Sequence, residues 1–197
     1  AVSGKGNVAI HAARKAQAEG AKVITLSDTS GTLYAADGLS VPAMDWVAEQ
    51  KAAGGHLSSP PKALDATFLA GEQPWTQEAD IALPCATQNE IDEKAAQALV
   101  DNGVRILAEG ANMPTTAEGL RVLRKGDVLY APGKAANAGG VAVSGLEMSQ
   151  MSHRRFMSAD EVDQALRTRM SDIHDRVAAE GQGGGTIDYA RGANLAG

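Results

Sequence analysis

The sequence contains a single cysteine, Cys85, and no excess of basic residues. One cysteine cannot form a disulfide within these 197 residues, which favours a reducing, cytoplasmic setting. The net charge is −6 with both signs interleaved, so no basic face for nucleic acid is expected. No apolar run approaches the length that crosses a membrane, and the N-terminus does not resemble a signal peptide. The expected partners therefore include neither nucleic acid nor a membrane.

Aromatic residues make up only 4% of the sequence, and there are only four histidines. The histidines lack the spacing of metal ligands, so no metal site is expected. Cys85 follows a predicted strand, but no histidine lies nearby in sequence to serve as its base. We interpret Cys85 as a small buried hydrophobe. Hydrophobic residues at 44% and charged residues at 21% are typical of a soluble globular protein.

Glycine, in contrast, is well placed at the start of the chain. Gly4, Gly6 and Ala9 fill a G-x-G-x-x-A pattern between a short apolar stretch and a predicted helix. Gly4 permits a tight turn, Gly6 lets the backbone approach a pyrophosphate, and Ala9 allows close packing of helix and strand. The helix would direct its free N–H groups at the phosphates. The alternative is an ordinary turn from strand to helix.

An acidic residue stands at the spacing that a dinucleotide site requires. Residues 21–28 read as a buried strand, and Asp28 lies 22 residues after Gly6. In dinucleotide-binding folds, an acid about 20 residues after the glycines meets the adenosine ribose. The alternative is that Asp28 only begins the turn over residues 28–31.

Strands and helices alternate along most of the chain. Strands are predicted at 79–84, 104–108 and 128–131, and each leads into a polar loop. Capping-box spacings at Thr87/Glu90 and Thr115/Glu118 predict the helices between them. This order predicts an α/β fold with a Rossmann-like, doubly wound sheet.

The character of the chain changes near residue 132. Residues 132–140 read as a loop of small residues, followed by a long helix from Val141 past Met151. A capping box at Ser158 and Glu161 then begins an amphipathic helix that ends at Gly181. We therefore expect a dinucleotide-binding domain over 1–140 and a C-terminal helical segment over 141–197.

Three polar loops beyond the strand ends are candidates for a nicotinamide site. They carry the neutral side chains of Thr87, Asn112 and Asn137. Neutral donors and acceptors suit a carboxamide and a ribose better than charged groups do. For each residue, ordinary turn chemistry is the alternative.

Several long segments resemble the hexameric, NADP-type glutamate dehydrogenases. They are IALPCATQNE (81–90), AEGANMPTT (108–116), APGKAANAGGV (131–141), SGLEMSQ (144–150) and GANLAG (192–197). The resemblance covers essentially the whole chain. It implies a Rossmann variant with one strand reversed, and C-terminal helices that pack back toward an N-terminal domain absent from these residues.

The resemblance also implies an activity and its participants. The family converts L-glutamate reversibly to 2-oxoglutarate and ammonia with NADP, and NAD is possible here. It forms homo-oligomers, here a hexamer. Its catalytic lysine and aspartate come from the N-terminal domain, so no catalytic residue is expected in this chain. Alternatives are a stand-alone dinucleotide-binding module and a dehydrogenase for another amino acid, although Ser144 would be out of place in the apolar pocket of the latter.

Pattern and resemblance together give two sets of site residues. The expected cofactor-binding residues are Gly4, Gly6, Asn7, Val8, Asp28, Ser30, Lys51, Ala86, Thr87, Asn112 and Asn137. The expected substrate-binding residues are Asn137, Gly140, Val141 and Ser144, with Ser144 holding the side-chain carboxylate of glutamate. Two departures concern the choice of cofactor. Lys5 stands where the family has serine, and residues 51–56 contain no arginine to hold a 2′-phosphate.

Overall fold

The chain divides into two units, Ala1–Leu129 and Tyr130–Gly197, which are described separately. The computed structural model describes residues 1–154, 156–183 and 185–197. The domain boundary that composition placed after residue 140 stays a prediction. Within the described ranges, none of the helices is long and apolar enough to span a bilayer.

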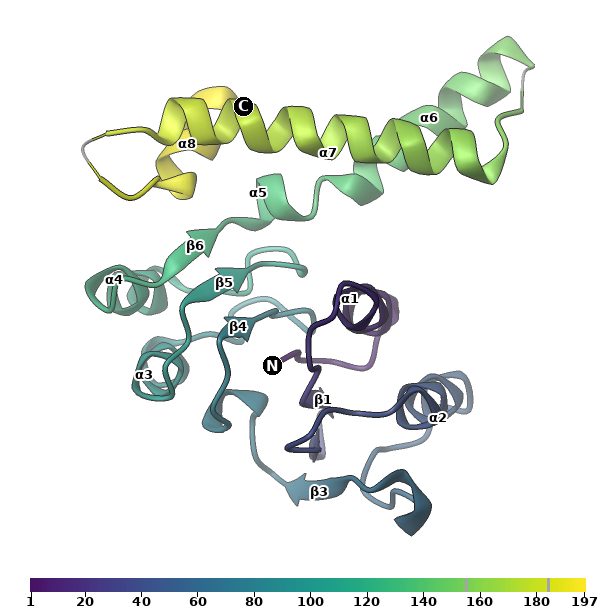
Figure 1. Ribbon diagram of the computed structural model, residues 1–197, viewed down its shortest axis with the longest axis vertical. Helices are drawn as coiled ribbons and strands as arrows, with labels where there is room; N and C mark the ends of the chain where they lie inside the picture. The colour runs from purple at the N-terminus through teal and green to yellow at the C-terminus, as the bar shows by residue number, and fades with distance from the viewer. Residues whose placement is uncertain (155, 184) are drawn as a thin grey trace. The chain divides into compact units, whose positions relative to one another are not determined.

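The first unit alternates helices with short strands (Figure 1). In chain order its elements are α1 (Asn7–Ala18), β1 (Thr25–Asp28), β2 (Gly31–Tyr34), α2 (Val41–Ala52), the 3₁₀ turn η1 (Lys62–Leu64), β3 (Thr67–Ala70), the 3₁₀ turn η2 (Pro74–Thr76), β4 (Ile81–Ala82), α3 (Glu93–Asp101), β5 (Ile106–Ala108), α4 (Ala117–Lys125) and the first residue of β6 (Leu129–Ala131).

Two three-stranded sheets, ordered β1-β2-β3 and β4-β5-β6, are joined by the opening residues of the chain. Val2 forms a parallel bridge with Leu83, and its N–H donates to Thr25 Oγ1 at 2.9 Å. The Ser27 N–H donates to the Gly4 carbonyl at 3.2 Å. The opening stretch thus lies between β1 and β4, and its carboxyl end meets theirs at one edge.

Strand directions confirm the predicted α/β architecture. β4 and β5 are parallel, whereas β2 is antiparallel to both β1 and β3 and is therefore the reversed strand. In Figure 1, α1 and α2 lie on one side of the strands and α3 and α4 on the other. This is a doubly wound arrangement, in which ligands collect beyond the carboxyl ends of the strands.

Small residues let α1 pack closely on the sheet. Ala9 and Ala13 are fully buried, beside Leu26 and Leu33 of the sheet and Met44 of α2. Burying a leucine side chain contributes about 1.5–3 kcal/mol. This core fixes the start of α1 against the end of β1, which places the glycine turn.

The starts of α3 and α4 differ from the predicted capping boxes. Asp92, not Thr87, caps α3, and its Oδ1 accepts from the Ala95 N–H at 2.8 Å. Thr116, not Thr115, caps α4. The cause is a parallel bridge between Ile91 and Thr115, which keeps both residues extended and delays each helix.

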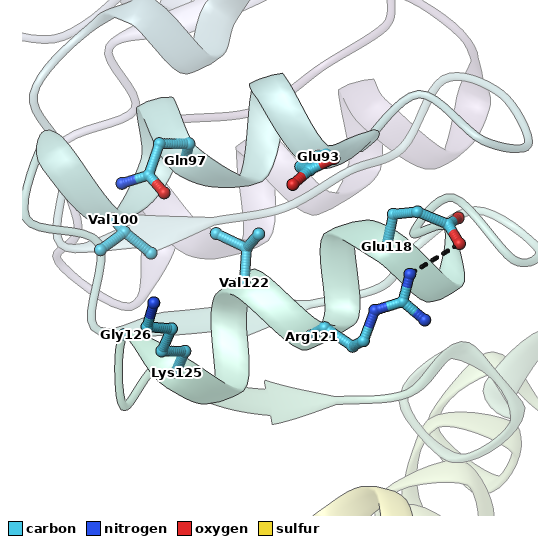
Figure 2. Close-up of a pocket in the computed structure, with 8 residues that line it drawn as sticks. All are labelled: Glu93, Gln97, Val100, Glu118, Arg121, Val122, Lys125 and Gly126. Atoms are coloured by element: carbon cyan, nitrogen blue, oxygen red, sulfur yellow. Dashed lines mark hydrogen bonds and ion pairs between the residues drawn. The ribbon is translucent and has the colours of Figure 1, made fainter.

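Helices α3 and α4 pack against each other along a shallow hollow of about 430 Å³ (Figure 2). A Cβ on Gly126 would lie 2.6 Å from a methyl group of Val100, so glycine is needed for this close approach. Figure 2 shows the Glu118–Arg121 ion pair of 2.9 Å at the rim. None of the predicted site residues lines this hollow.

The second unit is helical. Its elements are α5 (Gly133–Ala136), α6 (Gly139–His153), α7 (Ala159–Gly181) and α8 (Tyr189–Ala196), preceded by the rest of β6. The capping box at Ser158 and Glu161 is confirmed. Residues 132–140 are not a continuous loop as predicted, because they contain α5 and the start of α6. Gly184, in the glycine-rich segment 181–185, lies outside the described residues.

Candidate functional site

A cavity of about 510 Å³ opens where the carboxyl ends of the central strands meet in the first unit. Six of the predicted cofactor-binding residues line it: Gly4, Gly6, Asp28, Lys51, Ala86 and Thr87. Residues distant in sequence are thus brought together at the edge where a doubly wound sheet binds its ligands.

The glycine turn forms one wall of this cavity. Gly4 has φ +87°, and a Cβ on it would lie 3.2 Å from the Cα of Ala86 and the carbonyl oxygen of Cys85. At Gly6, in contrast, an added Cβ would meet nothing within 4 Å, so a ligand can approach the backbone. Gly6 is the N-cap of α1 and supplies no side-chain cap. The first turn of α1 therefore suits an anion.

Asp28 is the last residue of β1, and its carboxylate accepts hydrogen bonds from several segments of the chain. Its Oδ1 accepts from the Ser30 N–H at 2.8 Å and the Ser30 hydroxyl at 2.5 Å, and its Oδ2 accepts from the Leu57 N–H at 2.9 Å. The Lys5 ammonium lies 3.1 Å from Oδ2, and His56 Nδ1 lies 3.5 Å from it. Burial raises the pKa of Asp28, but the hydrogen bonds from Ser30, Leu57 and Lys5 outweigh it and lower the pKa to about 2.

Two lysines stand at the same cavity. Lys5 donates to the carbonyl oxygen of Gly55, in addition to its ion pair with Asp28. Lys51, near the end of α2, donates to the side-chain oxygen of Asn7 at the start of α1. Both ammonium groups therefore lie near the glycine turn, where they suit phosphate groups.

The loop after β4 is organised by a residue that sequence reasoning missed. The Glu90 carboxylate accepts from the N–H groups of Ala86 at 3.0 Å and Thr87 at 3.3 Å. Burial raises the pKa of Glu90, against the lowering effect of hydrogen bonds that include one from Ser3. The Ser3 hydroxyl oxygen accepts from the Cys85 N–H at 2.9 Å. Glu90 thus connects the loop after β4 to Ser3 in the opening stretch of the chain. The T-x-x-E spacing of Thr87 and Glu90 drew attention to this residue, but it predicted a helix cap instead of this contact.

Cys85 lies in the same wall and is a poor nucleophile. Burial and the Glu90 carboxylate raise the pKa of its thiol to about 12. The thiol is therefore protonated at neutral pH and packs as an apolar side chain. A Cβ on Gly110 would lie 2.5 Å from its sulfur, so the loop after β5 lies directly against it.

Comparison of the chain with known proteins identifies its family. Residues 1–197 match the family described as Glutamate/Leucine/Phenylalanine/Valine dehydrogenase. The chain belongs to this family. It is similar to the NADP-specific glutamate dehydrogenases of Psychrobacter sp. (50% identity, 100% of this chain and 45% of that protein) and Escherichia coli K12 (49%, 100% and 44%). An NAD-specific glutamate dehydrogenase of Bacteroides fragilis is 46% identical over 100% of this chain and 45% of its own length.

Solved structures agree with this family assignment. A glutamate dehydrogenase structure matches with a TM-score of 0.92 and 42% identity, over 99% of this chain and 44% of its own. The Plasmodium falciparum glutamate dehydrogenase structure matches with a TM-score of 0.91 and 34% identity, over 99% and 43%. The chain spans less than half the length of each of these relatives.

Within this dehydrogenase fold, four predicted cofactor-binding residues of the first unit lie outside the cavity lining. Ser30 acts on the cavity through Asp28, and Asn7 through Lys51. Val8 is 49% exposed on the first turn of α1. Asn112 is exposed on the loop after β5, and the N–H groups of Ala111 and Gly110 in that loop donate to the Pro84 carbonyl. The loops after β4 and β5 therefore lie side by side.

The predicted substrate-binding residues belong to the second unit. Asn137 and Val141 line a cavity of about 750 Å³ formed by α5, α6 and α7. Gly140 and Ser144 do not line it, although they share one exposed face of α6 with Val141, which is 79% exposed. In the described part of the chain, no group of three histidine, cysteine or acidic side chains could hold a metal ion.

Proposed function

We propose that the chain is the nucleotide-binding part of an NADP-dependent glutamate dehydrogenase. The reaction is the reversible oxidative deamination of L-glutamate to 2-oxoglutarate and ammonia. The observation that carries the proposal is the cavity that unites the uncapped start of α1, Asp28 and the Thr87 loop. Family membership and the names of the relatives support the substrate and the cofactor.

The cavity walls fit a dinucleotide. The open approach to Gly6 and the N–H groups of the first turn of α1 suit the diphosphate, with Asn7 and Val8 at its contact. Asp28, held by Ser30, and Lys51 face the adenosine ribose. Ala86, Thr87 and Asn112 face the nicotinamide, which when bound accepts the hydride equivalent removed from glutamate.

The residues of α6 position the substrate. In this proposal Val141 and Ser144 form the floor of the glutamate pocket, and the Ser144 hydroxyl donates to the side-chain carboxylate. Asn137 and Gly140 lie at the junction of cofactor and substrate. The catalytic acid–base groups come from sequence outside these 197 residues, in keeping with a chain that spans about 44% of its relatives. We also propose that the protein forms a homohexamer, which the resemblance supports, and that it lies in the cytoplasm, which the single cysteine favours.

Calorimetric titration of the 197-residue chain with NADP⁺ and NAD⁺ tests the cofactor site. We expect saturable binding of NADP⁺ and no oxidation of glutamate by the chain alone. Absence of binding would contradict the nucleotide site. Turnover of glutamate would contradict the placement of the catalytic groups elsewhere.

Substitution of Ser144 tests the substrate assignment in the enzyme assembled from the whole reading frame. Ser144→Ala should raise the KM for glutamate roughly tenfold or more, because the substrate carboxylate loses a donor in a closed site. Ser152→Ala, on an exposed part of the same helix, is the control. An unchanged KM for Ser144→Ala would remove this residue from the pocket and favour another amino acid as substrate.

A further inference from the structure

We propose that Glu109 is a positioning residue: its buried carboxylate holds the loop after β5 in shape and so sets Asn112 at the nicotinamide. This inference rests on the nucleotide site proposed above. It gives a task to an acid that lies outside both the glycine pattern and the cavity lining, so Glu109 acts through the loop and not on the ligand.

Glu109 is an acid in an environment that disfavours acids. It follows the last residue of β5 and is only 3% exposed. A buried carboxylate costs free energy unless hydrogen bonds satisfy it. Its Oε1 accepts from the Thr115 N–H at 3.3 Å, which joins the beginning of the loop to its end. The acid is therefore better explained by what it binds than by its bulk.

The loop after β5 is also fastened to the loop after β4, which lines the cavity. On one side of Asn112, the N–H groups of residues 110–111 donate to the Pro84 carbonyl at 3.0 and 2.9 Å. On the other side, the Asn89 N–H donates to the Met113 carbonyl at 3.1 Å. Asn112 thus stands between two anchored stretches of the loop.

The backbone beside Asn112 needs this support. Met113 has φ +48°, a left-handed conformation that is uncommon for residues other than glycine. Such strained backbone persists where surrounding contacts enforce it, and it clusters at ligand-binding sites. Without the closure by Glu109, we expect the loop to relax and Asn112 to leave its place.

The test separates the two halves of the cofactor in the enzyme assembled from the whole reading frame. Calorimetry measures the affinities of wild type and Glu109→Ala for NADP⁺ and for adenosine 2′,5′-bisphosphate, which lacks the nicotinamide. We expect Glu109→Ala to weaken NADP⁺ binding about tenfold, since a hydrogen bond to a charged group is lost. Binding of the bisphosphate should change less than about twofold, because this probe does not reach the Asn112 loop. The kcat for glutamate oxidation at saturating NADP⁺ should fall about tenfold or more, since misplaced reactants react slowly.

Two variants isolate the acceptor from the rest of the loop. Glu109→Gln retains a side-chain oxygen that can accept from the Thr115 N–H, so it should keep the NADP⁺ affinity within about threefold. Thr115→Val removes a buried hydroxyl that has no hydrogen-bond partner among the described residues, but keeps the N–H that Glu109 binds. This variant should leave the affinities for both ligands unchanged. Circular dichroism verifies that each variant is folded, and Glu109→Asp, whose carboxylate is one methylene shorter, replaces Glu109→Ala if the latter does not fold.

Equal weakening of both ligands by Glu109→Ala would show a merely structural role and would overturn the proposal. An unchanged NADP⁺ affinity in Glu109→Ala, no rescue in Glu109→Gln, or a loss in Thr115→Val as large as in Glu109→Ala would also overturn it, while leaving the nucleotide site intact. A wild-type enzyme that binds neither ligand would instead contradict the proposed function.

Discussion

At the scale of single residues, the ionised carboxylates of the site give direct tests of how charge stabilises the fold. The pKa of Asp28 falls from 3.8 to about 2, so ionisation of this carboxylate stabilises the folded state. Because the folded-state pKa is the lower one, this stability is present above about pH 4 and is lost as the pH falls toward 2. Urea unfolding of wild type and Asp28→Asn between pH 6 and pH 2.5 should show a stability difference that shrinks with falling pH. A difference independent of pH would show that the ionised carboxylate is not the stabilising group.

Glu90 is the second carboxylate with a defined task. Glu90→Ala removes the acceptor of the Ala86 and Thr87 N–H groups, so the loop beside the proposed nicotinamide position should loosen. NADP⁺ affinity should fall roughly tenfold, and amide exchange at these two residues should accelerate. Glu93→Ala, at an exposed position three residues later, provides the comparison. If both variants bind NADP⁺ equally well, Glu90 does not position the loop.

At the scale of elements, the close packing of α7 and α8 requires a glycine at position 192. A Cβ on Gly192 would lie 2.0 Å from the Val177 carbonyl oxygen, which is backbone and cannot move aside easily. Gly192→Ala should therefore cost about 1–3 kcal/mol of unfolding free energy, measured by urea denaturation. Gly145→Ala is the matched control, since a Cβ there meets nothing within 4 Å and alanine favours a helix by about 0.5–1 kcal/mol. Equal stability of the two variants would contradict the tight seam.

The same scale shows what local sequence can and cannot predict. Ser158 and Glu161 form the predicted capping box because both partners lie within one turn of helix. Thr87 and Glu90 have the same spacing, yet the long-range bridge between Ile91 and Thr115 keeps that segment extended. Capping chemistry is local, whereas strand pairing depends on residues far along the chain. Spacing alone therefore could not place the starts of α3 and α4.

The candidate site also contains residues that the sequence could predict and contacts that it could not. The glycine turn and Asp28 could be predicted together, because the motif fixes their separation along the chain. The contacts of Lys5 with Asp28 and Gly55 join three segments, and only the folded chain brings them together. Spacing alone left NAD and NADP open, whereas the resemblance to the NADP-type enzymes favoured NADP, in keeping with the NADP-specific relatives.

At the scale of the whole molecule, NADP⁺ should stabilise the two units unequally. Six predicted contact residues line one cavity of the first unit, and none of the predicted site residues lies on α7 or α8. A ligand that binds only the folded state at 100 times its Kd stabilises it by about 2.7 kcal/mol, a factor of about 100 in opening. Hydrogen exchange with saturating NADP⁺ should therefore slow strongly in the first turn of α1 and the loop after β4, and little along the α7–α8 seam. The same titration with Gly6→Val, which fills the open approach to the backbone, should abolish the difference. Equal slowing throughout both units would contradict binding at the glycine turn.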